Sequence, residues 1–462
     1  MTNIKDAKGI QGNPLGEEQI NKLLRQFAVP SIVSMLVGSL YNIVDQFFIG
    51  QSVGELGNAA TNIAFPLSIC CVAIGLVFGA GGAAAFNISM GSGKKEQAVR
   101  YMGNAITMIV ICGLLLSFMT HLFLEPLLQF FGSPESVLGY AKTYTRITAF
   151  GFPFAILTTG GAHLIRADGR PKISMVCNMT GAILNIFLDA IFVFGLKWGM
   201  AGAALATVIG QVISGILVIW YLSHCKTVKF ARCHIIPKLK NVKRIVSLGV
   251  APFSNQVSML IVQIVMNKSL KYYGSVSIYG EAIPIACAGI ISKVNMLFMS
   301  FVIGTSQGLQ PIASFNYGAK QFARVKEAYR KAIKVGATMA ILAFLIFQIF
   351  PRQIISLFGE GSEEYYNFAV RYFHIYMFFT FVNFLQPITS NFFTAIGKPK
   401  RGSFLALTRQ IIFLLPLLVV FPLLMGIDGI MYAGPVADAL AAVVTGIMIY
   451  REFRRSEYNV KM

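Results

Sequence analysis

Two carboxylates in apolar segments could bind a cation inside a membrane. Asp45 lies in the stretch LYNIVDQFFIG, and Tyr41 precedes it by one helical turn on the same face. Asp189 ends the stretch NIFLD, with Asn185 one turn before it. A charged side chain at membrane depth costs about 2.5 to 3.5 kcal/mol on insertion scales, so acids there indicate a function. We interpret the two acids as the working groups of an ion-driven transporter. The alternative is an interhelical hydrogen bond with no role in transport.

The residue types leave the identity of the ion open. A proton-coupled carrier needs a carboxyl group that binds and releases a proton, and two neighbouring acids titrate as a coupled pair. Sodium coupling instead needs several hard oxygen ligands, which Asp45, Asn185, Asp189 and Thr207 could supply. We therefore expect H⁺ or Na⁺ as the coupling ion and no other cofactor.

The composition indicates a polytopic membrane protein. Of the 462 residues 55% are hydrophobic and only 13% are charged, about half the charged share of soluble domains. Twelve apolar segments reach the length of about 20 residues that crosses the bilayer. They lie near 27–50, 61–90, 102–124, 141–163, 173–195, 199–222, 246–270, 282–312, 332–351, 367–392, 403–425 and 429–450.

The loop charges predict the orientation in the membrane. Alternate loops are basic, and the connection 223–244 carries seven Lys and Arg and no acid. The opposite loops carry Glu55, Glu125, Glu135, Glu360, Glu363 and Glu364 with few cations. The positive-inside rule therefore places both termini and the central loop in the cytoplasm, with the chain in the cell membrane. The net charge of +20 then reflects topology, and we expect no nucleic-acid partner.

The two halves of the chain resemble each other. The tetrapeptide GRPK at 169–172 recurs as GKPK at 397–400, and GMAG at 199–202 recurs as GIDG at 426–429. The resulting division is a cytoplasmic N-terminal segment 1–26, an N-lobe 27–222, a cytoplasmic linker 223–245, a C-lobe 246–450 and a cytoplasmic tail 451–462. Six helices per half give a parallel repeat, which typically holds a substrate site between the halves and works by rocking.

The acid pair belongs to the first half alone. Counted from Pro30 and Pro252, which stand at matching places near the start of each half, Asp45 corresponds to Asn267. Counted from the GRPK and GKPK motifs, Asp189 corresponds to Leu417, so the asymmetry favours an ion site in the N-lobe. The second half has buried charges of its own. They are Lys293, Arg409 and Asp438. Pairing of Asp438 with Lys293 or Arg409 would make a structural salt bridge, and the alternative is a second ion or substrate site.

Other classes of function lack support in the sequence. We find no nucleophile and base arrangement for catalysis and no nucleotide-binding motif, so we expect no enzyme. The cluster His224, Cys225, Cys233 and His234 does not have a standard zinc-ligand spacing, and we predict no metal site there. Most of the seven cysteines lie in membrane segments or the central loop, so no disulfide framework is expected.

Several motifs together resemble the MATE multidrug and toxic compound extrusion family. They are LYNIVDQFFIG in the first helix, NIFLD in the fifth, ADGRPK and AIGKPK before helices five and eleven, and QPIASFNYGAK after helix eight. Within the family the chain is similar to the DinF branch and its MepA-like exporters. The resemblance covers residues 20 to 452 and implies a MATE/MOP-type fold, an all-α membrane protein of twelve transmembrane helices in two pseudo-symmetric six-helix bundles.

The resemblance also implies a function and its residues. It implies the export of cationic or amphiphilic compounds in exchange for H⁺ or Na⁺, by a protein that we expect to be a monomer in the lipid bilayer. The ion site falls on Asp45, Asn185, Asp189, Thr207 and Tyr41, and substrate contacts are expected at Asp45, Asp189, Tyr144 and Asn267. Flipping of lipid-linked precursors by a related fold is the alternative function; a membrane enzyme or channel is the third. Pro30 either bends the first helix or starts it.

Overall fold

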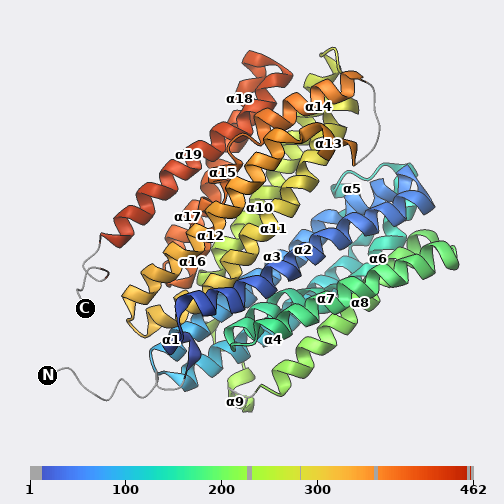
Figure 1. Ribbon diagram of the computed structural model, residues 1–462. Helices are drawn as coiled ribbons and strands as arrows, with labels where there is room; N and C mark the ends of the chain where they lie inside the picture. The colour runs from blue at the N-terminus through green and yellow to red at the C-terminus, as the bar shows by residue number, and fades with distance from the viewer. Residues whose placement is uncertain (1–12, 226–230, 281, 358–362, 455–457, 459–462) are drawn as a thin grey trace.

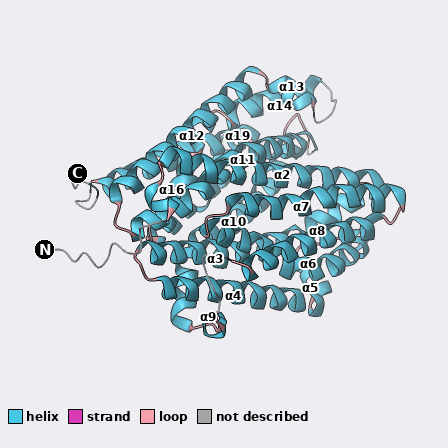
Figure 2. Cartoon of the chain, turned by 60° about the horizontal axis from the view of Figure 1, so that its bottom comes forward, coloured by secondary structure: helices cyan, strands magenta, loops and turns pink. Residues whose placement is uncertain are grey.

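The structure is a computed structural model that describes residues 13–225, 231–280, 282–357, 363–454 and 458. Every regular element within these ranges is helical (Figure 2). Parts of the expected N-terminal segment, linker and tail, namely 1–12, 226–230, 455–457 and 459–462, lie outside the described residues.

The first half of the chain forms six long helices and three short ones. Its elements are α1 (Pro14–Glu17), α2 (Ile20–Val53), α3 (Glu55–Gly91), α4 (Lys95–Leu122), α5 (Leu124–Phe130), α6 (Glu135–Ala167), α7 (Pro171–Asp189), its π-helical continuation η2 (Ala190–Gly195), α8 (Gly199–Ser223) and α9 (Arg232–Ile235).

The second half repeats this plan with more breaks. Its elements are α10 (Leu239–Ser275), α11 (Ala282–Gly318), α12 (Phe322–Ile349), α13 (Pro351–Ser356), α14 (Glu363–Tyr376), α15 (Thr380–Asn383), α16 (Leu385–Ala395), α17 (Pro399–Leu407), the π-helical η3 (Thr408–Leu414), α18 (Leu415–Met425) and α19 (Ile427–Phe453).

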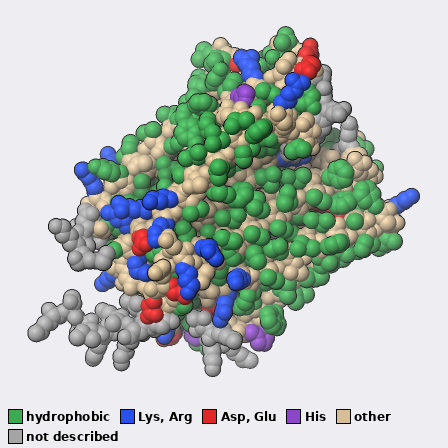
Figure 3. Space-filling model, viewed as in Figure 1, with side chains coloured by type: hydrophobic (Ala, Val, Ile, Leu, Met, Phe, Trp, Pro, Cys, Tyr) green, Lys and Arg blue, Asp and Glu red, His purple; other side chains and the backbone are tan. Residues whose placement is uncertain are grey.

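The helices are long and apolar enough to cross a membrane. Among the described residues eleven spans meet this test, and a twelfth runs through Glu363–Tyr376 and Thr380–Ala395 with a bend of 42° between them. Large apolar side chains lie on the outside of the protein, for example Phe118 and Trp220, so that the visible surface is mostly hydrophobic (Figure 3). The predicted all-α membrane fold is confirmed.

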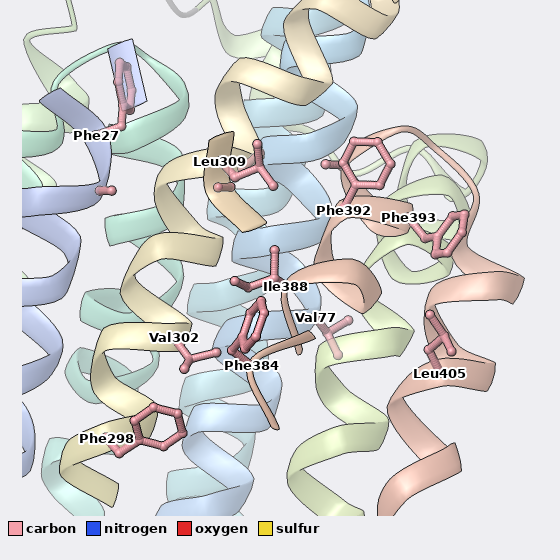
Figure 4. Packing of buried hydrophobic residues seen from close by; sticks show 14 of the residues in the cluster. Phe27, Val77, Phe298, Val302, Leu309, Phe384, Ile388, Phe392, Phe393 and Leu405 are labelled. Carbon is pink, nitrogen blue, oxygen red and sulfur yellow. The ribbon is translucent and has the colours of Figure 1, made fainter. Parts of the chain in front are cut away.

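The helices form two groups that follow the chain. In the first half α3 and α6 pack together, and α7 and α8 lie against each other and against α2. In the second half α11 packs on α12 and α16. The core of this half includes Val302, Phe384 and Ile388, which lie together (Figure 4). The groups meet where α2 packs on α11 and α3 packs on α10. They diverge toward the end that carries α5 and α18 (Figure 1).

The sequence repeats recur as repeated local geometry. Gly169 and Gly397 both adopt a left-handed φ, +84° and +73°, and each is followed two residues later by a proline in the first turn of the next helix. Gly199 and Gly426 are also left-handed, at +53° and +59°. Glycine tolerates this conformation because it has no Cβ. The two halves therefore use the same turns at matching places.

Pro30 lies inside α2, ten residues after the helix begins at Ile20. The interpretation of Pro30 as a helix-start proline is therefore wrong. Inside a helix a proline removes one backbone hydrogen bond and its ring crowds the preceding turn, which makes a bend easier at that point. The first span thus has a weak point between its end near the N-terminus and Asp45.

Candidate ion-binding site

The crossing of α7 and α8 builds the frame of the site. A Cβ on Gly181 would lie 2.2 Å from Oγ of Ser214 and 2.7 Å from the carbonyl oxygen of Gly210. Only glycine permits this approach of the two backbones. Ser214 also donates a hydrogen bond to the carbonyl of Cys177 (2.7 Å), which ties the two helices together.

One turn further along, Asn185 bridges the same two helices. In the amide orientation that satisfies both groups, its nitrogen donates to Oδ2 of Asp189 (3.1 Å) and its oxygen accepts from the backbone N–H of Thr207 (3.2 Å). Asn185 is 2% exposed and Asp189 is fully buried. The carboxyl group of Asp189 is thereby held in one position at the junction where α7 becomes π-helical, a feature frequent at functional sites.

Asp45 of α2 completes an acid pair with Asp189. The two carboxyl groups lie within hydrogen-bonding reach of each other. The Oδ1 atom of each is buried and receives no hydrogen bond within the described residues. Two carboxylate oxygens cannot hydrogen-bond without a proton between them. The pair is therefore a place that a proton, or a cation with oxygen ligands, would fill.

Tyr41 and Tyr144 lie beside the acid pair, close enough to interact electrostatically with Asp45 and Asp189. The hydroxyl of Tyr144 also hydrogen-bonds to Thr207. The structure thus brings together the five residues predicted for the ion site and, beside them, Tyr144, which was expected to contact the substrate; they come from α2, α6, α7 and α8.

The charged residues of the second half do not join this site. Arg409 of η3 forms an ion pair with Asp438 of α19, and Tyr376 hydrogen-bonds to the same guanidinium. Of the two cations considered for Asp438, the structure therefore pairs it with Arg409. Lys293 lies half-buried on α11, and within the described residues it has neither a hydrogen bond nor an ion pair. Asn267 is exposed on α10 and accepts a hydrogen bond from Gln263 (3.0 Å).

Sequence reasoning missed a second polar cluster, where the two halves meet. Gln310 of α11 donates to the carbonyl of Ala80 (2.9 Å), and its side-chain oxygen lies 3.3 Å from Nδ1 of His163. Arg166, 3% exposed, lies one turn beyond His163 and donates to Ser174 (2.9 Å). The available signal was a His and an Arg three residues apart, just before the basic ADGRPK motif.

Comparison with known proteins places the chain in a family. The MatE family model matches residues 30–191 and 255–420. The multidrug export protein MepA of Staphylococcus haemolyticus (strain JCSC1435) is 24% identical, over 94% of each chain. MepA of Staphylococcus aureus (strain MW2) is 22% identical, over 93% of each chain.

The solved structures agree with the sequence relatives. The MATE multidrug transporter DinF-BH, solved as a ligand complex, is 32% identical, covers 96% of this chain and 98% of its own, and superposes with a TM-score of 0.87. An outward-facing MATE family transporter of the MOP superfamily is 21% identical, covers 98% of both chains, and also has a TM-score of 0.87. This chain belongs to the MatE family of multi-pass membrane proteins.

Proposed function

We propose that this protein is a secondary active antiporter that exports cationic or amphiphilic compounds from the cell in exchange for H⁺ or Na⁺. It would act as a monomer in the cell membrane, with both termini in the cytoplasm. Relatives over nearly the whole chain are named multidrug exporters, which supports the substrate class. Helix α1 and the last turns of α19 lie at one end of the protein, as an even number of spans requires (Figure 1).

The observation that carries the proposal is the facing acid pair, Asp45 and Asp189. Their orphaned oxygens are buried in the outer part of a membrane span, and isolated charges there are costly. Binding of a cation relieves that cost, so an occupied pair stabilises the conformation of the first half in which the two acids are buried together. The hydroxyl oxygens of Thr207 and Tyr144 beside the pair fit either a protonated pair or a bound Na⁺, and the amide nitrogen of Asn185 holds Asp189 in place.

Helix α2 connects the ion site to the contact between the halves. Asp45 lies near its outer end, and Ser39, 4% exposed, meets Ser300 of α11 with an oxygen–oxygen distance of 2.7 Å. Pro30 lies between these contacts and the start of the helix. A change at Asp45 that bends or rotates α2 would therefore alter the contact with α11. Rocking of the halves would then expose a substrate site to one side of the membrane at a time.

Flipping of lipid-linked precursors is the alternative function. It would require several cations to hold a pyrophosphate group between the halves. An enzymatic role has no support from the relatives, which are transporters.

The test is dye efflux from vesicles that contain the purified protein. A pH gradient and a sodium gradient are imposed separately, and export of the cationic dye rhodamine 6G is followed. Asp45→Asn keeps the size of the side chain but removes its charge. The matched control is Asp428→Asn, which changes an acid at the outer surface that is paired with Arg371 (2.8 Å).

We expect wild-type protein and the Asp428 variant to export the dye under one of the two gradients, and the Asp45 variant to lose most of that activity. The effective gradient identifies the ion. Folded wild-type protein that moves no dye under either gradient would rule out the antiporter and favour the lipid flippase.

A further inference from the structure

Lys293 is a charged group for which the proposed ion cycle has no use. It lies about a third of the way along α11 from its outer end, half-buried. Within the described residues no carboxylate lies in ion-pair contact with it. A lysine at membrane depth that has no protein partner marks a functional site more often than a structural one.

Helical register shows which way Lys293 faces. On α11, a Cβ at Gly308 would lie 2.6 Å from Cα of Ala28 and one at Gly304 would lie 2.5 Å from Cα of Ile32. Ser300 continues the same face, because it contacts Ser39 of α2. Lys293 precedes Ser300 by seven residues, nearly two full turns at about 3.6 residues per turn. Lys293 therefore lies on the side of α11 that is turned toward the first half.

Helix α10 also turns one side toward the first half. A Cβ at Gly249 would lie 2.1 Å from the carbonyl oxygen of Val77, so this side of α10 is turned toward α3. Asn267 follows Gly249 by eighteen residues, which is five turns, and lies on the same side. Gln263 lies one turn before Asn267 and donates to it. The polar groups on this side are the amides of Gln263 and Asn267 and, one turn further along, the ammonium group of Lys271.

On the opposing helix, α2, Gln46 follows Ala28 by eighteen residues and is exposed. Asp45 is turned about 100° away from Gln46, toward α7. We call these sides of α2, α10 and α11 the interlobe faces. From these helix–helix contacts to the outer ends of the helices, the described residues on the interlobe faces include no Asp or Glu. Lys293 therefore has no acid opposite it on these faces.

The geometry points to Lys293 as a binding site for an anionic oxygen group, a carboxylate or a phosphate, of an amphiphile held between the two halves. This inference rests on the proposed export function and narrows its substrate class. A substrate with an apolar body, a cationic group and an anionic group would place the anion at Lys293, and Gln263 and Asn267 would offer amide hydrogen bonds nearby. The acid pair within the first half then serves the coupling ion, and Lys293 serves the substrate.

A matched pair of dyes separates this idea from export in general. Rhodamine 6G is an ethyl ester, and its free acid has the same cationic ring system with a carboxylate in place of the ester. Binding of each dye to the purified protein is measured by fluorescence polarisation in a neutral detergent. The variants are Lys293→Met, which removes the charge, and Lys293→Arg, which keeps it. The control is Lys334→Met, on an exposed part of α12.

We expect Lys293→Met to weaken binding of the free acid by about tenfold or more, as for the loss of a charge-assisted hydrogen bond, and to change ester binding by less than about threefold. Lys293→Arg and Lys334→Met should keep the wild-type preference. Equal losses for both dyes, or an unchanged affinity for the acid in a folded Lys293→Met protein, would overturn the inference. Wild-type protein that exports the ester but not the free acid would also overturn the inference, and it would leave the antiporter proposal standing.

The anionic group could belong to an exported compound or to a membrane lipid. The binding measurement is therefore repeated with phosphatidylglycerol or phosphatidylcholine added to the micelles. Displacement of the acid dye by phosphatidylglycerol alone assigns the site to a lipid head group. Retention of the dye with both lipids assigns it to the exported amphiphile, and either outcome supports an anion site at Lys293.

Discussion

Removal of one member of the Arg409–Asp438 ion pair should destabilise the protein far more than removal of both. The side chain of Arg409 is 12% exposed and that of Asp438 is 4% exposed. In Asp438→Leu the guanidinium stays buried with no carboxylate beside it. Breaking a buried pair in this way costs about 3 to 5 kcal/mol, whereas replacing both partners by apolar groups of similar volume is often close to neutral.

The double variant Arg409→Met/Asp438→Leu therefore should recover most of the stability that Asp438→Leu loses. Tyr376 hydrogen-bonds to Arg409 and loses its partner in the double variant, so a residual cost of about 1 kcal/mol is expected. The exposed pair of Arg371 and Asp428, 50% and 30% exposed, is the control. Asp428→Asn should change stability by less than about 1 kcal/mol.

The assay heats detergent-solubilised protein and follows the loss of the monodisperse peak in size-exclusion chromatography. We expect wild type to have the highest midpoint temperature, the double variant to come next and Asp438→Leu to have the lowest. A double variant no more stable than Asp438→Leu, or an Asp438→Leu protein as stable as wild type, would refute it. A double variant that is stable but exports no dye would show instead that the pair takes part in transport.

Two further predictions follow from contacts between helices. Gly181→Ala should force α7 away from Ser214 and disturb the frame of the candidate ion site. We therefore expect it to abolish gradient-driven efflux in protein that still folds. Gly139→Ala is the control and should stay active, because a Cβ there meets nothing within 4 Å. Arg324→Ala removes a hydrogen bond to the carbonyl of Glu18 (2.7 Å), so hydrogen exchange of residues 15–24 should rise about tenfold, and unchanged exchange would contradict this role.

Much of the fold could be predicted because a membrane restricts which residues and which secondary structure a span can have. Spans must be apolar and helical, since no water is present to satisfy an exposed backbone. The twelve predicted segments match the observed helices, although the helices extend several residues beyond them. α10, for example, begins at Leu239 rather than near 246. The extensions carry lysines and polar residues, for which hydropathy gives no signal of a span.

The residues of the candidate ion site were partly predictable for a related reason. Carboxylates in apolar segments are rare, so Asp45 and Asp189 stand out by type alone, and one-turn spacing adds Tyr41 and Asn185. Thr207 entered only as one of several possible oxygen ligands for Na⁺, and Tyr144 came from the family resemblance, because a threonine and a tyrosine are ordinary residues of membrane helices. No local pattern indicates that the crossing at Gly181 brings Thr207 to Asn185.

The sequence by itself determined the membrane class, the number of spans, the repeat and the acids of the first half, because each depends on residue type and spacing along one chain. The tertiary structure decided which cation pairs with Asp438 and which way Lys293 faces. Both depend on the rotation of each helix against its neighbours, which is set by close contacts such as Gly304 against Ile32 between residues far apart in the chain. Those contacts arise only when the two halves pack together.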